Sequence, residues 1–289
     1  MNKTAAHAAI SRNALVVEGG AMRGIFAAGV LDAFLKNNFN PFELCIGVSA
    51  GASNIAAYLG QQHRRNYRVY TEFCTNPEFI SWKKFFCGGH LMDLDWLWDI
   101  SIREIRLDLK KIFSSGKEFL VGVTSAVRGR AVFLKPDEST CEQYLKVSSA
   151  VPLSYRTIHS IGGVPMVDGG IGASIPAAEA WRRGGQRIMA IRTQPLSYVR
   201  RATFVTKIHA FAMRKYPCLR QAMLDRADRY MQEVAFLRNP PRDVRIIEVA
   251  PPAIRTSRFT KDLHLLEKDY HAGIEQGLTA MKRWNESRF

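Results

Sequence analysis

A serine stands at the centre of the sequence GVSAG, residues 47–51, which fits the pattern G-x-S-x-G. In this pattern the serine occupies a sharp turn from a strand into a helix, where its hydroxyl is exposed and small neighbours leave room for the tight backbone. A hydroxyl of this kind can attack the carbonyl carbon of an ester. Serine is also a favoured N-cap residue, so the motif alone predicts that Ser49 is either a nucleophile or a helix cap.

Glycines also gather in the segment GGAMRG, residues 19–24, directly after an apolar run. The segment is typical of a tight turn between a strand and a helix. It lacks the spacing of the nucleotide-binding pattern G-x-G-x-x-G, and no Lys-Ser or Lys-Thr pair follows, as it would in a P-loop. A third interpretation is an oxyanion hole, in which the backbone N–H groups of Gly19, Gly20 and Ala21 stabilise the charge formed at an attacked carbonyl. One such donor contributes about 2.7–4 kcal/mol.

The third motif, Asp168-Gly169-Gly170, contains an acidic residue that could assist such a serine. The sequence Asp-Gly-Gly after a short apolar run is most often only a turn. A serine nucleophile needs a base, however, and a partly buried carboxylate can have a raised pKa and accept the hydroxyl proton. We expect Asp168 to end a strand at the carboxyl edge of a parallel sheet, where ligands bind in such sheets.

The first sixty residues predict the elements that hold two of these motifs together. Apolar runs at residues 14–18 and 44–48 are short enough to be buried strands, and a helical spacing of apolar residues follows each of them, at 25–35 and 50–59. This order predicts neighbouring parallel strands with right-handed crossovers. The carboxyl ends of the two strands should therefore lie side by side, with the glycine-rich segment next to Ser49.

The rest of the chain continues the alternation of strands and helices. We expect one α/β domain over residues 14–193 and a mostly helical C-terminal extension over residues 194–289, packed on the same domain. Further strands are predicted at residues 119–123, 131–134, 164–167, 187–191 and 244–249, and further helices at 142–147 and 177–183.

Taken together, the three motifs resemble those of the patatin-like phospholipases, a family of lipid acyl hydrolases with a Ser-Asp dyad. The resemblance covers most of the chain and preserves the family order: a glycine-rich loop, then G-x-S-x-G, then Asp-Gly-Gly. The Ser-Ser-Ala-Val-Pro stretch at residues 148–152 is also similar to that of the family. The resemblance implies a three-layer α/β fold with a mainly parallel central sheet flanked by helices.

The resemblance also assigns roles to residues. It implies Ser49 as the nucleophile of a lipid ester hydrolase and Asp168 as the base. The oxyanion hole that it implies consists of Gly19, Gly20 and Ala21, and the positions that support the motifs are Arg23, Gly24, Gly47, Gly51, Gly169 and Gly170. One residue departs from the family pattern, because Ala21 stands where glycine is usual. Its Cβ disfavours a positive φ, so the role of its N–H is the open point of the assignment.

Two other interpretations stay open at this stage. The first is an α/β-hydrolase with a Ser-Asp-His triad, because His209, His264 and His271 follow Asp168 in the order that such a triad requires. Against it, only one predicted strand precedes the strand that leads into Ser49, and His209 falls within a helical pattern. The second is a basic membrane- or nucleic-acid-binding module on which the motifs are incidental.

The composition is that of a globular protein with an excess of positive charge. The 289 residues are 47% hydrophobic and carry a formal net charge of +15. Such a charge favours polyanions, but no nucleic-acid-binding signature accompanies it, and no nucleic acid is expected as a partner. Five scattered cysteines, and an N-terminus MNKTAAHAAISR without an apolar core, predict a cytoplasmic protein, peripheral to a membrane at most. No cluster of metal ligands stands out, so neither a metal nor a cofactor is expected.

Two segments could serve a lipid substrate. Residues 79–102 are rich in aromatic residues, among them Trp96 and Trp98, and are a candidate wall or lid for an acyl chain, although such residues more often fill a core. Residues 204–212 place apolar side chains on one face of a helix, which can lie in a membrane interface or pack on the protein. We expect reversible contact with anionic bilayers through this helix. The basic residues around it are Arg200, Arg201, Lys207, Arg214 and Lys215.

Overall fold

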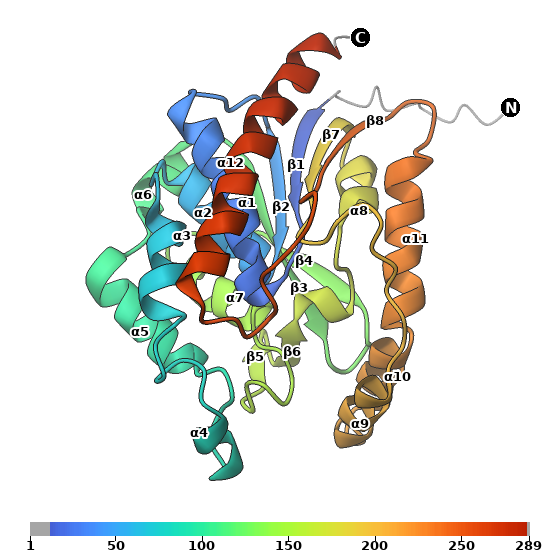
Figure 1. The fold of residues 1–289 in the computed structure, drawn as a ribbon. Coiled ribbons are helices and arrows are strands. Elements are labelled where there is room, and N and C mark those ends of the chain that lie inside the picture. Colours follow the sequence, from blue (N-terminus) through green and yellow to red (C-terminus); the bar gives the residue numbers. More distant parts are fainter. Residues whose placement is uncertain (1–11, 288–289) are drawn as a thin grey trace, which may run out of the picture.

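The computed structural model describes residues 12–287 of the chain, without the side chains of Val205 and His209. An eight-stranded sheet crosses the molecule, and helices cover both of its faces (Figure 1). The strand order is β5-β6-β3-β2-β1-β7-β8, and β4 pairs with β3 outside this path. The strands are β1 (Arg12–Val17), β2 (Leu44–Val48), β3 (Glu118–Ser125), β4 (Ala131–Leu134), β5 (His159–Ile161), β6 (Val164–Asp168), β7 (Gly185–Ile191) and β8 (Arg245–Val249).

The sheet is mainly parallel, as the sequence predicts. Strands β3, β2, β1, β7 and β8 form a continuous parallel block. Strands β4 and β6 run antiparallel to β3, and β5 runs antiparallel to β6. The predicted opening of the chain is confirmed, because β1 and β2 are parallel neighbours connected through α1 (Gly24–Lys36), and α2 (Ala50–Leu59) follows β2.

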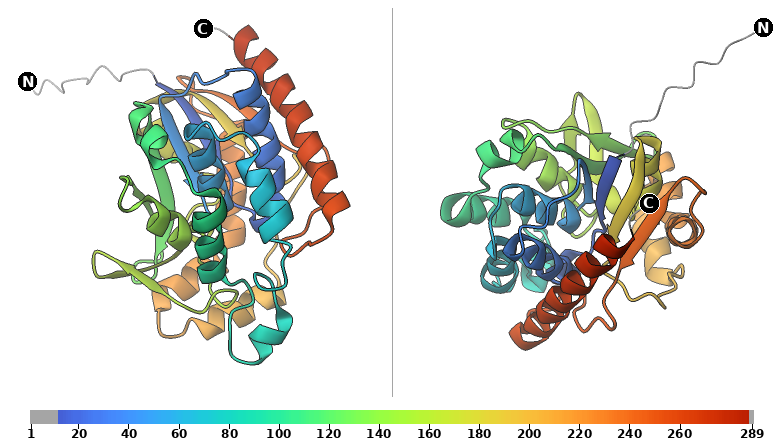
Figure 2. Two further views of the ribbon diagram at one scale, coloured as in Figure 1. Left: turned by 90° about the vertical axis from the view of Figure 1, so that its left-hand side faces the viewer. Right: turned by 90° about the horizontal axis from the view of Figure 1, so that it is seen from above.

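Successive residues of the central strands face two different hydrophobic cores, because side chains alternate along a strand. Leu15 and Val17 of β1 pack with residues of α1, α2 and the C-terminal helix α12 (Leu263–Glu286). Ala14 and Val16 pack on the other face with residues of α8 (Ala177–Arg182) and α11 (Arg226–Arg238). The view from above in Figure 2 shows the resulting layers, with the sheet between the two sets of helices. The three-layer α/β fold class is thus confirmed.

The remaining helices are short and lie around the carboxyl ends of the parallel strands or beside them. In both Figure 1 and Figure 2, α4 and α9 project from the same end of the molecule. The bounds are α3 (Arg65–Arg68), the π-helix η2 (Val69–Phe73), α4 (Trp82–Phe86), α5 (Leu94–Ile105), α6 (Leu109–Ser114), α7 (Cys141–Ser148), α9 (Phe204–Ala212) and α10 (Pro217–Leu224). The 3₁₀ helices η1 (Ala21–Arg23) and η3 (Gly169–Ile171) follow β1 and β6.

The C-terminal segment is joined closely to the rest of the fold. Strand β8 extends the sheet beside β7, and α12 crosses α1 where two glycines meet. A Cβ added to Gly29 would lie 2.1 Å from the Tyr270 carbonyl oxygen, and one added to Gly273 would lie 2.2 Å from that of Phe26. The Tyr270 hydroxyl donates a hydrogen bond of 2.8 Å to Asp32 at this crossing.

None of the helices between residues 12 and 287 combines the length and apolarity needed to cross a bilayer.

Candidate active site

Ser49 occupies a strained turn between β2 and α2. Its φ of 54° and ψ of −130° are rare for a residue with a Cβ, and such a conformation costs on the order of 1–3 kcal/mol unless its surroundings fix it. The Ser49 N–H donates to the buried Ser148 hydroxyl oxygen at 2.7 Å, and that hydroxyl donates to the Gly122 carbonyl at 2.6 Å. The Ser49 side chain makes no capping hydrogen bond to α2. The turn therefore presents a hydroxyl and does not use it as a helix cap.

The two glycines of this motif are needed for close packing. A Cβ on Gly47 would lie 2.4 Å from the Ala52 Cα, and a Cβ on Gly51 would lie 2.4 Å from the Val17 carbonyl oxygen. Either distance is far below any real contact of a Cβ. Neither glycine has a positive φ, because the positive φ of this motif belongs to Ser49. Close packing, and not backbone conformation, therefore requires a small residue at both positions.

The glycine-rich loop lies beside Ser49, as the parallel pairing of β1 and β2 predicts. A Cβ added to Gly19 would lie 3.0 Å from the Ser49 Cβ. Gly19, Gly20 and Ala21 line the same cavity as Ser49, and within the described part of the chain their N–H groups donate no hydrogen bond. Ala21 has a φ of 50°, so it adopts the left-handed conformation in spite of its Cβ. The loop thus offers free N–H groups next to the serine hydroxyl.

The strand that carries Asp168 runs in the opposite direction to the predicted one. We expected the end of a parallel strand, but β6 runs antiparallel to β3. It starts beyond the carboxyl end of β3, where Met166 is opposite Ser125, and runs back so that Asp168 is opposite Val123. Val48 is opposite Gly122 on the other side of β3, so Ser49 and Asp168 stand at the same level. The sequence shows a short apolar run before Asp168 but not its direction.

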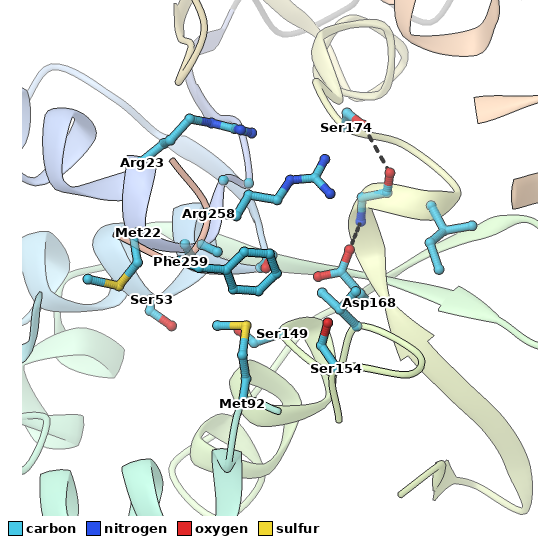
Figure 3. A pocket seen from close by; sticks show the side chains of 18 of the residues that line it. Met22, Arg23, Ser53, Met92, Ser149, Ser154, Asp168, Ser174, Arg258 and Phe259 are labelled. Carbon is cyan, nitrogen blue, oxygen red and sulfur yellow. Dashed lines mark hydrogen bonds between the residues drawn. The ribbon is translucent and has the colours of Figure 1, made fainter. Parts of the chain in front are cut away.

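The Asp168 carboxyl group is buried, with 2% of the residue exposed. Oδ1 accepts a hydrogen bond of 2.9 Å from the Gly170 N–H (Figure 3), while Oδ2 has no partner of full hydrogen-bond geometry among the described residues. Burial raises the pKa of this carboxyl group above its usual value. The positive charge of Arg226, the nearby Ser49 hydroxyl and the Gly170 N–H oppose that rise in pKa. The carboxyl group is therefore held next to the serine with one oxygen free.

The remaining motif positions support this arrangement. A Cβ on Gly24 would lie 2.2 Å from the Tyr70 hydroxyl oxygen, and one on Gly169 would lie 2.1 Å from the Gly122 carbonyl oxygen. Gly170 supplies the N–H that binds Asp168, and Arg23 is buried in the wall of the cavity. The structure thus brings all the sequence-predicted site residues to one place, either in the cavity wall or directly behind it.

The cavity at this site has a volume of about 450 Å³ and a largely apolar region. Trp98 lines the cavity, whereas Trp96 is partly buried and packs against the hydrophobic core. The aromatic-rich segment therefore contributes to both the cavity wall and the core. Many of the apolar side chains that line the cavity come from residues 69–98, and these are Val69, Tyr70, Phe79, Met92, Leu94, Leu97 and Trp98. A concave apolar region beside a few polar groups is typical of a binding site for a small molecule.

No described histidine lines the cavity. His264 and His271 lie on α12 with exposed side chains, and the side chain of His209 is outside the described residues. Among the described side chains, the titratable neighbour of Ser49 is therefore a carboxyl group and not an imidazole. Between residues 12 and 287 there is also no group of three or more potential metal-binding side chains.

Sequence reasoning missed several residues that shape the site. Ser148 fixes the backbone of Ser49, and the Thr124 hydroxyl donates to the Asp168 carbonyl at 2.7 Å. Two further side chains in the cavity wall, Arg226 and Arg258, come from the C-terminal segment. Ser148 opens the Ser-Ser-Ala-Val-Pro stretch, so a signal for it existed. The arginines stand in no motif, and only the fold brings them here.

The chain is similar to known proteins over most of its length. The chain is 33% identical over 267 residues to the uncharacterized protein YjjU of Escherichia coli strain K12, a match that covers 91% of this chain and 75% of that protein. A solved structure, VipD from Legionella pneumophila, aligns with 14% identity and a TM-score of 0.48, covering 95% of this chain and 67% of that one. Residues 216–288 match the model of a domain of unknown function. Residues 15–181, which include all three motifs and more than half of the chain, match the model of the patatin-like phospholipases. The chain therefore belongs to the patatin-like phospholipase family.

Proposed function

We propose that the protein is a serine hydrolase of lipid esters in which Ser49 is the nucleophile and Asp168 the base. The observation that carries this proposal is the strained turn at Ser49, which presents a hydroxyl next to a buried carboxyl group and next to free backbone N–H groups. Strain retained at a turn that other residues fix is characteristic of functional sites. Membership of a family of lipid hydrolases supports the same conclusion.

The reaction follows from these positions. The Ser49 oxygen attacks the ester carbonyl carbon while Asp168 accepts the hydroxyl proton. The negative charge that develops on the carbonyl oxygen is stabilised by the N–H groups of Gly19, Gly20 and Ala21, and by the amino ends of α1 and α2. The tetrahedral intermediate collapses, and the alcohol leaves with the proton from Asp168. A water molecule then attacks the acyl-enzyme, with Asp168 as its base, and releases the fatty acid and the free serine.

A serine-reactive fluorophosphonate probe tests this proposal directly. We expect the probe to label the wild-type protein and to leave Ser49→Ala unlabelled, because only a nucleophilic hydroxyl displaces the fluoride. Ser53→Ala is the matched control, since Ser53 lines the same cavity and should not affect labelling. Labelling that survives in Ser49→Ala, or that is lost in Ser53→Ala, would show that the nucleophile lies elsewhere.

The pH dependence of hydrolysis should report the environment of Asp168. The base acts only when ionised, so kcat/KM is expected to fall as the pH drops through the raised pKa of Asp168. Arg226→Gln removes the charge that most opposes this rise, so the acidic limb should move to higher pH. The measurement is kcat/KM against pH for a soluble neutral ester, with Arg220→Gln, an exposed arginine, as control. A limb that stays in place or moves to lower pH in Arg226→Gln contradicts the assignment of Asp168.

We further propose that the enzyme contacts anionic bilayers reversibly, on the cytoplasmic side, through the end of the molecule that carries α4 and α9. Phe204 and Phe211 on α9 are 76% and 60% exposed, and Phe86 on α4 is 79% exposed. The Phe86 ring stacks on Trp82, which also contacts Phe259 of the cavity wall. Exposed apolar groups with basic neighbours are typical of interfacial helices. The helices α4 and α9 lie toward the carboxyl end of the sheet (Figure 1), and Thr206 of α9 lines the cavity.

One of the basic residues expected at this surface, Arg200, lies in the cavity wall. Arg200 lines the cavity and lies over the Tyr230 ring at 4.2 Å, so its substitution would change the site as well as the surface. Lys207, Arg214 and Lys215 are exposed on or directly after α9 and are the appropriate residues to vary. Each basic residue near an anionic surface contributes about 1 kcal/mol of binding free energy.

Vesicle co-sedimentation checks this contact. Binding should increase with the fraction of anionic lipid and decrease with added salt, which screens charge. Lys207→Glu with Lys215→Glu should weaken binding without a change in turnover of a water-soluble ester, and Phe204→Ala with Phe211→Ala should weaken it at every lipid composition. Leu278→Ala, an exposed apolar residue of α12, is the control. Equal binding to neutral and anionic vesicles would show that the basic residues do not attract the protein to anionic lipid.

A further inference from the structure

Four arginine side chains line the part of the cavity next to Asp168, and they come from four separate segments of the chain. They are Arg23 in η1, Arg200 in the loop before α9, Arg226 at the start of α11 and Arg258 in the loop before α12. Arg226 and Arg258 belong to the segment that matches a domain of unknown function. That segment therefore contributes charged groups to a cavity whose other charged and polar groups come from earlier parts of the chain.

These guanidinium groups have no anionic partner in the described part of the chain. No carboxylate of the described residues lies within salt-bridge distance of any of the four, and the Nε atoms of Arg23 and Arg226 and Nη1 of Arg200 are buried without an acceptor. Arg23 is only 8% exposed. Arg200 and Arg226 are partly buried, and Arg258 is exposed. Buried cationic groups without acceptors are unfavourable, so the cluster is suited to a bound anion.

The cluster keeps a surplus of positive charge at neutral pH. Burial, and then the charges of Arg200 and Arg258, lower the pKa of Arg226 to about 9, which still leaves it protonated. Asp168 is the only carboxylate among the described residues that line the cavity. Glu18 lies behind the loop, where its Oε2 accepts a hydrogen bond of 2.8 Å from the Thr193 N–H. The four guanidinium groups thus outnumber the Asp168 carboxylate in the cavity and the Glu18 carboxylate behind the loop.

The loop that carries Arg258 is held in place before any ligand binds. Asp269 of α12 accepts hydrogen bonds from the Thr256 N–H at 2.7 Å and from its hydroxyl at 2.6 Å, which fixes the loop that carries Arg258. Arg226 lies against Gly170, where an added Cβ would be 3.1 Å from its Nη2. A site assembled in advance loses less conformational entropy on binding.

The cavity is divided into a cationic side and an apolar side. Figure 3 shows Arg23 and Arg258 on one side and Met92 on the opposite side, with Phe259 between them. Many other apolar residues of the wall come from the same part of the chain as Met92, residues 69–98, while Met22, Ile171 and Met223 come from elsewhere. A ligand that spans the cavity would therefore place an acyl chain on the apolar side and an anionic group on the arginines.

We propose that the C-terminal segment completes a phosphate-binding subsite, and that the preferred substrate is an acylglycerol phosphate whose phosphate is a monoester. This inference rests on the proposed ester hydrolysis. Guanidinium groups bind the oxygens of a tetrahedral phosphate in pairs, and a dianionic monoester matches the surplus charge of the cluster. A choline headgroup would bring a further cation toward four arginines, so phosphocholine esters should be poorer substrates.

The test compares three esters with the same oleoyl chain: 1-oleoylglycerol 3-phosphate, 1-oleoylglycerophosphocholine and 1-oleoylglycerol. We expect the wild-type enzyme to give the highest kcat/KM with the phosphate monoester. Arg258→Gln should lower that value at least tenfold, mainly through KM, because it removes a charge-assisted hydrogen bond. Arg258→Lys should restore part of the loss. The value for 1-oleoylglycerol should fall less in Arg258→Gln than the value for the phosphate monoester, and all values in Arg220→Gln should stay within about threefold of the wild type.

Lipid binding to the inactive Ser49→Ala variant tests the subsite independently of catalysis. Titration of that variant with 1-oleoylglycerol 3-phosphate should show tighter binding than 1-oleoylglycerol, and Arg258→Gln in the same background should abolish the difference. If the neutral ester is hydrolysed as well as the phosphate ester, and both bind equally, the subsite is wrong while the serine hydrolase stands. If inorganic phosphate alone binds as tightly as the lipid phosphate, the cluster serves a free anion and the lipid assignment is overturned.

Discussion

Ser49→Ala and Asp168→Asn are each expected to lower kcat for a lipid ester by about 10⁴-fold or more, while the protein remains folded. The first change removes the attacking oxygen. The second leaves a side chain of the same shape that cannot accept the proton. The Asp168 carboxyl group is buried at the same level of the sheet as Ser49, so no other described carboxylate of the cavity can replace it. The measurement is kcat with a long-chain ester, alongside a thermal melt of each variant.

Histidine variants are the control for this prediction. His264→Ala and His271→Ala alter exposed side chains of α12 and should leave kcat within a few-fold of the wild type. We predict the same for His209→Ala, whose side chain is outside the described residues. If His209→Ala is as inactive as Ser49→Ala, the site is a triad, and the assignment of Asp168 as the direct base is wrong.

Gly273→Ala is expected to lower the free energy of unfolding by about 2–3 kcal/mol, the range for adding a methyl group to a filled core. The new Cβ would lie 2.2 Å from the Phe26 carbonyl oxygen of α1, so the two helices must move apart. That movement also strains the hydrogen bond between Tyr270 and Asp32. The loss should exceed the gain of up to about 1 kcal/mol that alanine brings to a helix interior over glycine.

Urea denaturation measures this effect, and the crossing offers a graded comparison. Gly29→Ala should be as damaging, since its Cβ would lie 2.1 Å from the Tyr270 carbonyl oxygen. Gly277→Ala should cost less, because its nearest neighbours, the Ala33 Cβ among them, would be 2.9 Å away. Lys282→Ala, on the exposed side of α12, should stay within about 0.5 kcal/mol of the wild type. Equal midpoints for Gly273→Ala and Lys282→Ala would contradict a close packing of α12 on α1.

Local patterns predicted much of the fold because the parallel strands are short, buried and bounded by turns. β2 (Leu44–Val48) and β4 (Ala131–Leu134) have the predicted bounds, and α1 lies where its apolar spacing indicated. The short strand β5 (His159–Ile161) was missed, since three half-exposed residues carry no periodic signal. The direction of β6 was also wrong, because a run of five residues does not show which way its neighbour runs.

The site was predictable to the extent that its residues stand in motifs. Ser49, Asp168 and the loop at Gly19 meet as expected, because each stands at the carboxyl end of a strand of the sheet. Arg226 and Arg258 were not predictable as site residues, since they lie far along the chain in segments without a motif. Arg200 was expected on a membrane-facing surface and lies in the cavity wall. Charge alone did not distinguish a side chain that faces solvent from one that turns inward.

The anchoring of the Arg258 loop by Asp269 has a consequence for the order in which the enzyme is made. The ribosome synthesises the chain from its amino end, so Ser49 and Asp168 emerge long before α12, which carries Asp269. Until that helix has folded onto α1, the loop with Arg258 has no fixed place. A nascent chain therefore holds its serine and its carboxylate before it holds its cationic wall. Selectivity for a charged lipid would be acquired only after α12 has been synthesised and has folded onto α1.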